Sequence, residues 1–261
     1  MSDGGFPPIG DYAFISDCHS CALIGRDASV EWACFHRFDG RPPFARILDR
    51  DVGGYFRIAP GADWEGSQRY LPDTNVLETT FTTATGAVTI TDCLPLRGDP
   101  DDPGETERPY PSHLLIRVVR GIRGSVEMKL EFRPRFEYGM TTPLIHSHDA
   151  DLVQATGGAE ALVLQSELAP LIRDGRGAVE AETEVQAGDE LVVALTQFTS
   201  HRLAVERLEH ADLTSRIDET VRFWQAWSGI TEYEGDYSHA VRRSALAIKG
   251  LTEARTGAVV A

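Results

Sequence analysis

The sequence predicts a mainly β protein, a large antiparallel β-sandwich followed by helices near the C-terminal end. Three observations predict this class. Short runs with apolar and polar residues at a period of two recur between about residues 12 and 200, Gly- or Asp-containing turns separate many of them, and a helical period appears only from residue 212 onward. Strands that follow one another without helical crossovers pair in antiparallel fashion, which favours a sandwich.

The clearest predicted strand is SVEMKLEF, residues 125–132, in which apolar and charged side chains alternate. Successive side chains of a strand point to opposite faces, so this period indicates a half-buried strand. Two hairpins are expected, one over residues 75–95 turning at Thr85-Gly86 and one over residues 113–132 turning near Gly121 to Gly124. Further strands are expected at residues 12–15, 22–25, 29–35, 54–59, 151–155, 160–165, 178–186 and 190–198.

Two helices are expected after the strands. The first covers residues 212–227, with Asp212 as its N-cap and one apolar stripe, and a linker at 228–236 follows it. The stripe consists of Leu213, Ile217, Val221, Trp224 and Trp227.

The second helix covers roughly residues 237–254 and is apolar on two sides, with Thr256-Gly257 as its stop. Tyr237, Val241, Ile248 and Leu251 share one face, and Leu246 points elsewhere. Leaving four such side chains in water would forfeit roughly 6–12 kcal/mol, at about 1.5–3 kcal/mol each. A helix that is apolar on two sides is expected between two layers. We therefore expect it to pack on the sandwich or on a second copy, or to belong to a further domain.

Composition excludes several classes of function. The formal net charge is -15, with 40 acidic and 25 basic residues, which disfavours nucleic acid and anionic membrane as partners. Cys18 and Cys21 form one C-x-x-C among four cysteines, and reduced thiols are favoured over a zinc site because no second pair follows. No apolar run of 18 residues and no signal-peptide pattern is present, so a cytoplasmic location is expected.

Residues 7–60 resemble the opening of bacterial glycoside hydrolase family 15, the glucoamylases and trehalases. Two further segments resemble the same family: RPRFEYG at residues 133–139, and residues 241–261, which are similar to the first helix of its catalytic domain. Residues 33–36 and 40–43 depart from the usual family sequence. The matched pieces are Asp11-Tyr12, Asp17-Cys18, Ala22-Leu23, Asp27 with Ser29, Trp32 with Cys34, Arg37-Phe38-Asp39, Phe44, Leu48 and Ile58-Ala59-Pro60.

The resemblance implies an N-terminal β-supersandwich at residues 1–205, a helical linker at 206–236, and the first helix of a truncated (α/α)6 catalytic barrel at 237–261. It also implies inverting hydrolysis of an α-glucoside or trehalose by two carboxyl groups of the barrel. No position of this chain matches either one. We therefore expect no catalytic residue, no cofactor and no metal here, and a chain that is inactive by itself.

Five residues are candidates for substrate binding in the intact enzyme, because aromatic faces stack on sugar rings and charged groups bind hydroxyls. They are Trp32, Arg37, Phe38, Asp39 and Tyr138. The alternative is a core strand that ends in a structural Arg–Asp pair. Glu31 with Asp39 is a weak acid/base candidate, and His146 with His148 a weak metal candidate.

Three functions remain open at this stage. The first is the non-catalytic domain of a glucoamylase- or trehalase-like enzyme that shapes the active site of its barrel. The second is a freestanding carbohydrate-binding or assembly module that forms a homodimer through its last helix. The third is a small hydrolase with both carboxylates within the chain. The sequence does not discriminate trehalose from α-glucan as the substrate.

Overall fold

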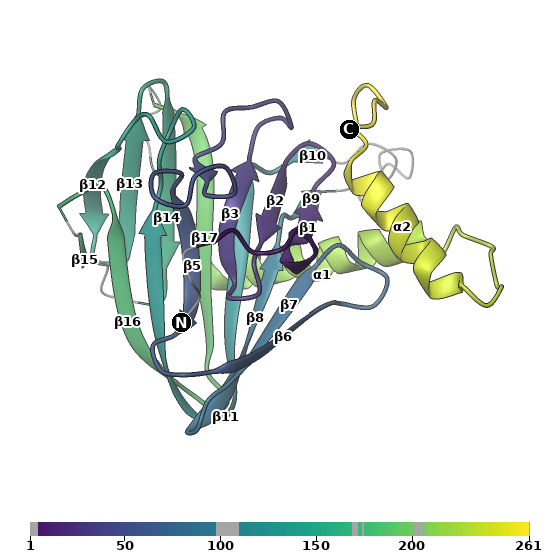
Figure 1. Ribbon diagram of the computed structural model, residues 1–261, viewed down its shortest axis with the longest axis horizontal. Coiled ribbons are helices and arrows are strands. Elements are labelled where there is room, and N and C mark those ends of the chain that lie inside the picture. Colours follow the sequence, from purple (N-terminus) through teal and green to yellow (C-terminus); the bar gives the residue numbers. More distant parts are fainter. Residues whose placement is uncertain are drawn as a thin grey trace.

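The computed structural model describes residues 5–97, 110–168, 172–173, 175–200, 205 and 207–260. The prediction of a mainly β, antiparallel fold with helices at the C-terminal end is confirmed (Figure 1). The strands form two layers, and a short 3-10 helix, Ile9–Asp11, precedes them. Layer A contains β1 (Ala13–Ser16), β2 (Cys21–Ile24), β3 (Ser29–Cys34), β4 (Phe44–Ala45), β5 (Tyr55–Pro60), β15 (Ile172–Arg173) and β16 (Val179–Gln186). Layer B contains β6 (Glu65–Tyr70), β7 (Leu77–Thr82), β8 (Gly86–Cys93), β12 (Leu144–Asp149), β13 (Leu152–Gly157), β14 (Glu160–Ser166) and β17 (Glu190–Thr199). A separate pair consists of β9 (Leu96–Arg97) and β10 (Tyr110–Pro111).

One strand belongs to both layers. β11 runs unbroken from Leu114 to Arg133; its first half pairs with β17 and β8, and its second half pairs with β16 and β5. The hairpin predicted near Gly121 to Gly124 is therefore wrong, because the chain bulges there and continues forward. A side chain at Gly121 would place its Cβ 1.8 Å from a backbone oxygen of Gln186, and Gly124 has a φ of +62°. These glycines permit a bulge with close strand approach rather than a reversal.

The alternation along β11 separates two cores. Leu115, Val119 and Met128 face the main core, which lies between the layers. Ile116 and Val118 face the other side of layer B, where they pack under the helices. Apolar side chains therefore occupy both faces of this half of β11, which is why its sequence reads LLIRVV rather than as a strict alternation.

Arg117 is the exception inside the main core. Its side chain is fully buried, and its Nε donates to Asp92 of β8 at 2.6 Å. The same guanidinium donates to the carbonyl oxygens of Ala28, in the turn before β3, at 2.6 Å and of Phe56 on β5 at 3.1 Å. Burial raises the pKa of Asp92, and the adjacent guanidinium opposes that rise. One cation thus joins the two layers, and every hydrogen bond it makes is charge-assisted.

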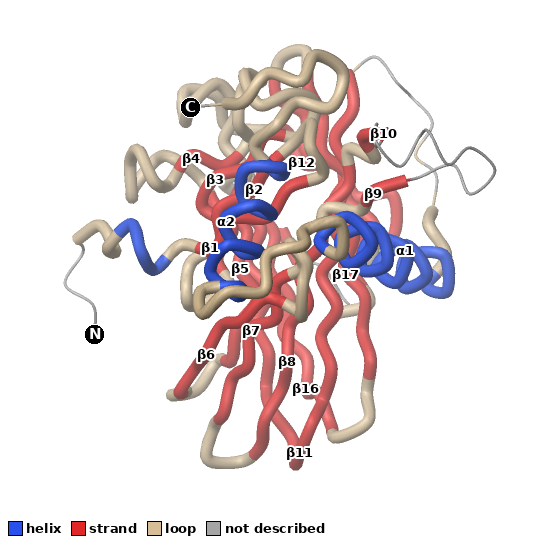
Figure 2. Tube along the Cα trace, turned by 90° about the vertical axis from the view of Figure 1, so that its right-hand side faces the viewer, coloured by secondary structure: helices blue, strands red, loops and turns tan. Residues whose placement is uncertain are grey.

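Two helices follow the strands, as predicted. α1 runs from His210 to Ser228 and lies beside β17 of layer B (Figure 2). Its apolar stripe packs on the outer face of that layer. Asp212 lies in the first turn and the N-cap is Glu209, so the predicted cap is wrong by three residues. His210 bridges Glu167 and Glu190, which fastens the start of the helix to the sheet.

α2 runs from Ser238 to Gly250 and lies across β1 (Figure 2). Leu246 is its buried anchor at 2% exposure. Side chains of the sandwich hold the carbonyl oxygens of its last turns: Ser16 Oγ donates to Gly250 at 2.6 Å, and Asn75 Nδ2 donates to Leu246 at 2.9 Å. The bond from Ser16 satisfies an acceptor that the end of the helix leaves unpaired. Arg243 adds a bond to Thr74 O at 2.6 Å.

The other side of α2 is bare. Tyr237 just before the helix is 73% exposed, Ile248 is 56% exposed and Val241 is 37% exposed. One side of α2 packs on the sandwich, which is one of the predicted alternatives, and the other side lies in solvent. We call Tyr237, Val241 and Ile248 the free face of α2.

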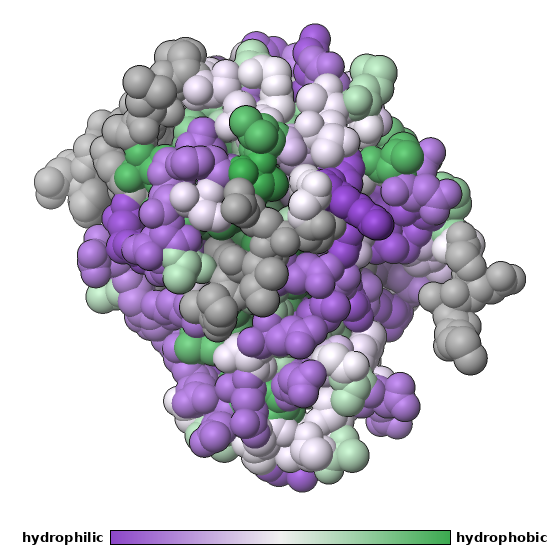
Figure 3. Space-filling view, turned by 90° about the vertical axis from the view of Figure 1, so that its left-hand side faces the viewer, coloured by the Kyte–Doolittle hydropathy of each residue, from purple (hydrophilic) through white to green (hydrophobic). Residues whose placement is uncertain are grey.

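The sequence analysis missed the two-residue strands β4, β9, β10 and β15. It also missed β6 and β12, which are mostly exposed edge strands. On the face of the molecule that carries β12 and β16, hydrophilic residues predominate (Figure 3). No helix in the described part of the chain is long and apolar enough to cross a bilayer.

Candidate functional site

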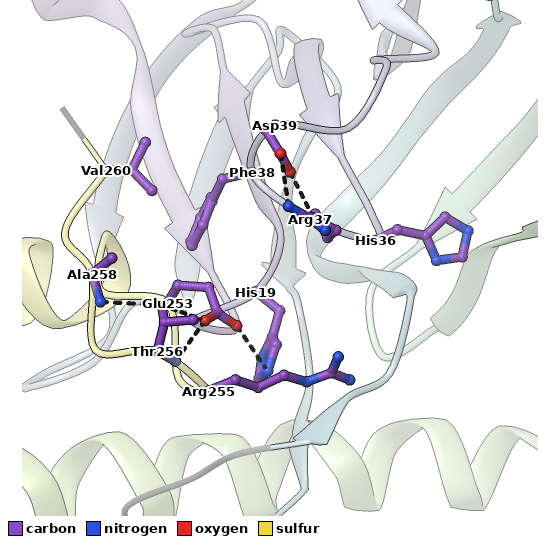
Figure 4. Close-up of a pocket in the computed structure, with 10 residues that line it drawn as sticks. All are labelled: His19, His36, Arg37, Phe38, Asp39, Glu253, Arg255, Thr256, Ala258 and Val260. Atoms are coloured by element: carbon purple, nitrogen blue, oxygen red, sulfur yellow. Dashed lines mark hydrogen bonds and ion pairs between the residues drawn. The ribbon is translucent and has the colours of Figure 1, made fainter.

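A hollow of about 500 Å³ lies where two loops of the N-terminal strands meet the segment after α2 (Figure 4). Its walls come from the turn after β1, the loop after β3 and the segment after α2. The lining residues are His19, His36, Arg37, Phe38, Asp39, Glu253, Arg255, Thr256, Ala258 and Val260. Its volume lies within the range that small-molecule sites occupy.

The first wall is the tight turn at residues 17–20. Asp17 is fully buried; its Oδ1 accepts from the backbone N–H groups of His19 at 3.0 Å and Ser20 at 2.6 Å. Cys18 adopts a φ of +65°, which this turn requires. Burial raises the pKa of the Asp17 carboxyl, and its hydrogen bonds oppose that rise. The turn is therefore fixed by its own hydrogen bonds, and it aims His19 at the hollow (Figure 4).

The second wall is a loop organised by Glu253. Its Oε2 accepts from both the backbone N–H and the hydroxyl of Thr256 at 2.8 Å, and its Oε1 lies 3.7 Å from Nε2 of His19. Burial alone would raise the pKa of Glu253, but the hydrogen bonds from Thr256 hold it below the usual range. Ala254 N donates to Cys18 O at 3.0 Å, so a backbone hydrogen bond connects this loop directly to the turn.

The third wall holds three of the five predicted substrate-binding residues. Arg37 and Asp39 form a two-pronged ion pair, with Nε to Oδ1 at 2.7 Å and Nη2 to Oδ2 at 2.8 Å. Both side chains are at least 70% exposed. Phe38 lies between them and presents its ring to the hollow beside the Glu253 loop (Figure 4). Burial lowers the pKa of His36, as does His113, whose ring centroid lies 4.3 Å away.

The other two predicted residues, Trp32 and Tyr138, do not line this hollow. Their rings lie 6.4 Å apart, so they form a separate aromatic pair. Tyr138 is 49% exposed, and it and Glu137 have positive φ angles of 59° and 52°. Non-glycine residues adopt this region at a cost, and clusters of such residues mark loops whose shape is needed.

Glu31 and Asp39 do not form an acid/base pair. Glu31 is buried, accepts a 2.5 Å hydrogen bond from the Tyr12 hydroxyl and pairs with Arg50. Burial raises the pKa of Tyr12, as does its bond to Glu31. Asp39 is engaged with Arg37, so neither carboxylate is available as a lone acid or base.

His146 and His148 lie on the exposed strand β12 with ring centroids 4.7 Å apart, and His148 contacts Gln154. Within the described ranges, no group of three or more His, Cys, Asp or Glu side chains is placed to hold a metal ion.

The hollow can bind a polar, uncharged ligand. It offers an aromatic face, a guanidinium, a carboxylate and imidazole rings, which together bind hydroxyl groups and cover an apolar ring surface. The sequence analysis missed His19 and Glu253, because 234 positions separate them in the chain. The local signal was a His between Cys18 and Cys21, a pair that the sequence analysis weighed only as a zinc site.

The fold and the hollow define an antiparallel β-sandwich domain with a recess of mixed lining and a helix attached along one edge. The chain belongs to the trehalase-like N-terminal family: the family described as "Trehalase-like, N-terminal" matches residues 4–224.

The chain is similar to two curated proteins called "Trehalase". That of Mycolicibacterium smegmatis is 34% identical over 98% of this chain, and that of Mycobacterium tuberculosis is 35% identical over the same share. The chain spans only 40% and 39% of those two proteins. The chain also matches a solved structure titled "Putative kojibiose phosphorylase from human microbiome". The match covers 91% of this chain and 31% of that protein, with 9% identity and a TM-score of 0.38, and we draw no conclusion from a similarity this low.

Proposed function

We propose that this chain is the non-catalytic N-terminal domain of a cytoplasmic, inverting α-glucoside hydrolase of glycoside hydrolase family 15, of the trehalase rather than the glucoamylase type. In this proposal residues 1–205 are the supersandwich, 206–236 the linker and 237–261 the first helix of an (α/α)6 barrel. The barrel carries the two carboxyl groups that act on opposite sides of the glycosidic bond. The sandwich packs on the barrel and shapes the entrance to its active site.

The observation that carries the proposal is the two-sided helix α2. Its inner side is anchored by Leu246, Ser16 and Asn75, while its free face leaves Ile248 and Val241 in water. A contiguous exposed apolar face rimmed by polar residues marks a protein-protein contact. The trehalases of Mycolicibacterium smegmatis and Mycobacterium tuberculosis are each more than twice the length of this chain, which supports a further domain as the occupant.

The hollow supports the second half of the proposal. One of its walls is the segment that directly follows α2. A domain that covers the free face would therefore stand next to Arg37, Phe38 and Asp39. In that position Phe38 would cover one sugar face and the Arg37–Asp39 pair would bind its hydroxyls. The Trp32–Tyr138 pair would form the outer rim.

A chimera tests this function. This chain replaces the matching N-terminal 40% of the Mycolicibacterium smegmatis trehalase, and hydrolysis of trehalose and of maltose is measured. The chimera is expected to hydrolyse trehalose in preference to maltose, and this chain alone is expected to hydrolyse neither. A folded chimera without activity would refute the shaping role, and turnover by the chain alone would refute its non-catalytic character.

Asp39→Ala in the chimera tests the hollow. Loss of a hydrogen bond to a charged group costs about 1.5–3 kcal/mol, so kcat/KM for trehalose should fall about 10- to 100-fold. The matched control is Asp11→Ala, which removes the aspartate of another exposed pair, with Arg26, outside the hollow. Equal effects of the two substitutions would show that the hollow has no special part in the reaction.

The alternative is a freestanding carbohydrate-binding or assembly module that dimerises through α2, because the same free face would suit a second copy. Sedimentation of the chain with and without Val241→Ser and Ile248→Ser distinguishes the two. A dimer that these substitutions dissociate, together with an inactive chimera, would favour the module over the enzyme domain.

A further inference from the structure

Cys21 and Cys34 are direct neighbours across two strands. In the register of β2 and β3, Cys21 lies opposite Cys34. Residues directly opposite in an antiparallel pair have Cα atoms about 4.5–5.5 Å apart, and a disulfide needs about 4.4–6.8 Å. Their side chains therefore emerge on the same face of the sheet, at a separation that a disulfide can span. The sequence motif suggested a different partner for Cys21, since only Cys18 stands at C-x-x-C spacing.

The neighbouring Cys21 thiol lowers the pKa of Cys34, and Trp32 lowers it further, whereas Cys34 and burial raise the pKa of Cys21. The pair can thus hold one thiolate that its neighbours stabilise. Cys34 is buried beneath Gly40, whose carbonyl oxygen lies 3.5 Å from its Sγ, while Cys21 is half-buried and gives reagents access to the pair.

The other two thiols provide an internal contrast. Cys18 Sγ faces Lys249 O at 3.5 Å under α2, and Cys93 is fully buried against α1. Burial raises the pKa of each to about 12. Neither forms a thiolate readily, and in the described strands neither lies opposite a cysteine.

We propose that Cys21 and Cys34 form a redox-active pair that a peroxide converts to a cross-strand disulfide. The thiolate of the pair attacks one peroxide oxygen, the O–O bond breaks, and a sulfenic acid and hydroxide result. The second thiol then attacks the sulfenic sulfur, the S–S bond forms, and water leaves. The two thiols lose two electrons and two protons, and hydrogen peroxide becomes two molecules of water. This inference does not depend on the proposed function.

The position of the pair gives the disulfide a structural consequence. Trp32 stands two residues before Cys34 on the same face of β3, and the Arg37–Asp39 loop begins three residues after it. A bond from β2 to β3 at this point would remove both thiols as partners of the indole and would tether the strand from which the loop departs. The fluorescence of Trp32 therefore reports on the reaction.

Peptide mapping of the whole chain tests the proposal. The reduced protein is treated with hydrogen peroxide at pH 7.5, denatured with N-ethylmaleimide and digested with trypsin. The peptide ending at Arg26 holds Cys18 and Cys21, and the peptide 27–37 holds Cys34, so fragment ions identify the bond. Two of the four thiols should disappear together, joined as Cys21–Cys34, about tenfold faster than Cys18 or Cys93 reacts. Dithiothreitol should restore both.

Two variants sharpen the result. Cys18→Ser should leave the cross-link intact, whereas Cys21→Ser should abolish it and leave Cys34 to be alkylated or oxidised alone. The fluorescence change on oxidation should be absent in Trp32→Phe. Any of three outcomes would overturn the inference: a bond through Cys18, oxidation of the four thiols at similar rates, or Cys21 and Cys34 both fully alkylated after peroxide treatment.

Discussion

The buried Arg117 offers the sharpest test of how this fold is held together. Arg117→Met keeps a side chain of similar length but leaves the fully buried Asp92 carboxylate without its cation. Removing one partner of a buried ion pair costs about 3–5 kcal/mol. The carbonyl oxygens of Ala28 and Phe56 lose their donors as well, which adds to the cost. A loss of this size is a large share of the ~5–15 kcal/mol that stabilises a typical domain.

Urea unfolding measures the effect. With a slope of about 3 kcal/mol/M, a loss of 3–5 kcal/mol lowers the midpoint by roughly 1–1.7 M. The matched control is Arg120→Met on the same strand, whose exposed pair with Glu190 should cost less than ~1 kcal/mol. The double variant Arg117→Met with Asp92→Leu removes the stranded charge and should recover part of the stability. Equal midpoints for the Arg117 and Arg120 variants would refute the reasoning.

Three further perturbations address the helices and the strand shared by the layers. The hydrogen bond with Glu167 raises the pKa of His210 above its usual ~6.5, so its stabilisation should be complete below pH ~6.5 and vanish as pH rises through the folded-state pKa. Thermal midpoints of wild type and His210→Gln should therefore differ at pH 6 and converge toward pH 9; a constant difference would contradict this. Gly121→Ala should lower the free energy of unfolding, measured by urea denaturation, by at least ~1–3 kcal/mol, because the new Cβ would lie 1.8 Å from the backbone oxygen of Gln186. An unchanged free energy of unfolding would mean that the bulge can relax. Leu246→Ala should cost about 2–5 kcal/mol and Ile248→Ala less than ~0.5 kcal/mol; similar losses would show that α2 is seated differently.

The sequence was sufficient to predict the strands that have one face on the core and one face in solvent. Residues 125–132 alternate because one face of β11 meets the main core and the other carries charged side chains such as Glu127 and Lys129. It failed at Gly121 and Gly124, since glycine permits a reversal and a bulge equally well, and only the pairing of distant strands decides between them. The edge strands β6 and β12 were missed because they bury too little to show a pattern.

The site was predictable only in part. Arg37, Phe38 and Asp39 were found from a local cluster of aromatic and charged residues, and they do line the hollow. Their partner wall at Glu253 could not be found, because no periodicity links the turn after β1 to the loop after α2. The burial of Arg117 could not be predicted either, since an arginine in a strand is ordinarily interpreted as a solvent-facing residue.

The unbroken course of β11 makes the two layers interdependent in stability. Its backbone supplies ladder hydrogen bonds to β8 and β17 at one end and to β5 and β16 at the other. If β11 separates from one layer, the same strand is also lost from the other layer. Denaturation of the sandwich is therefore a single cooperative event, and the amides of this strand exchange with solvent only when the entire sandwich opens.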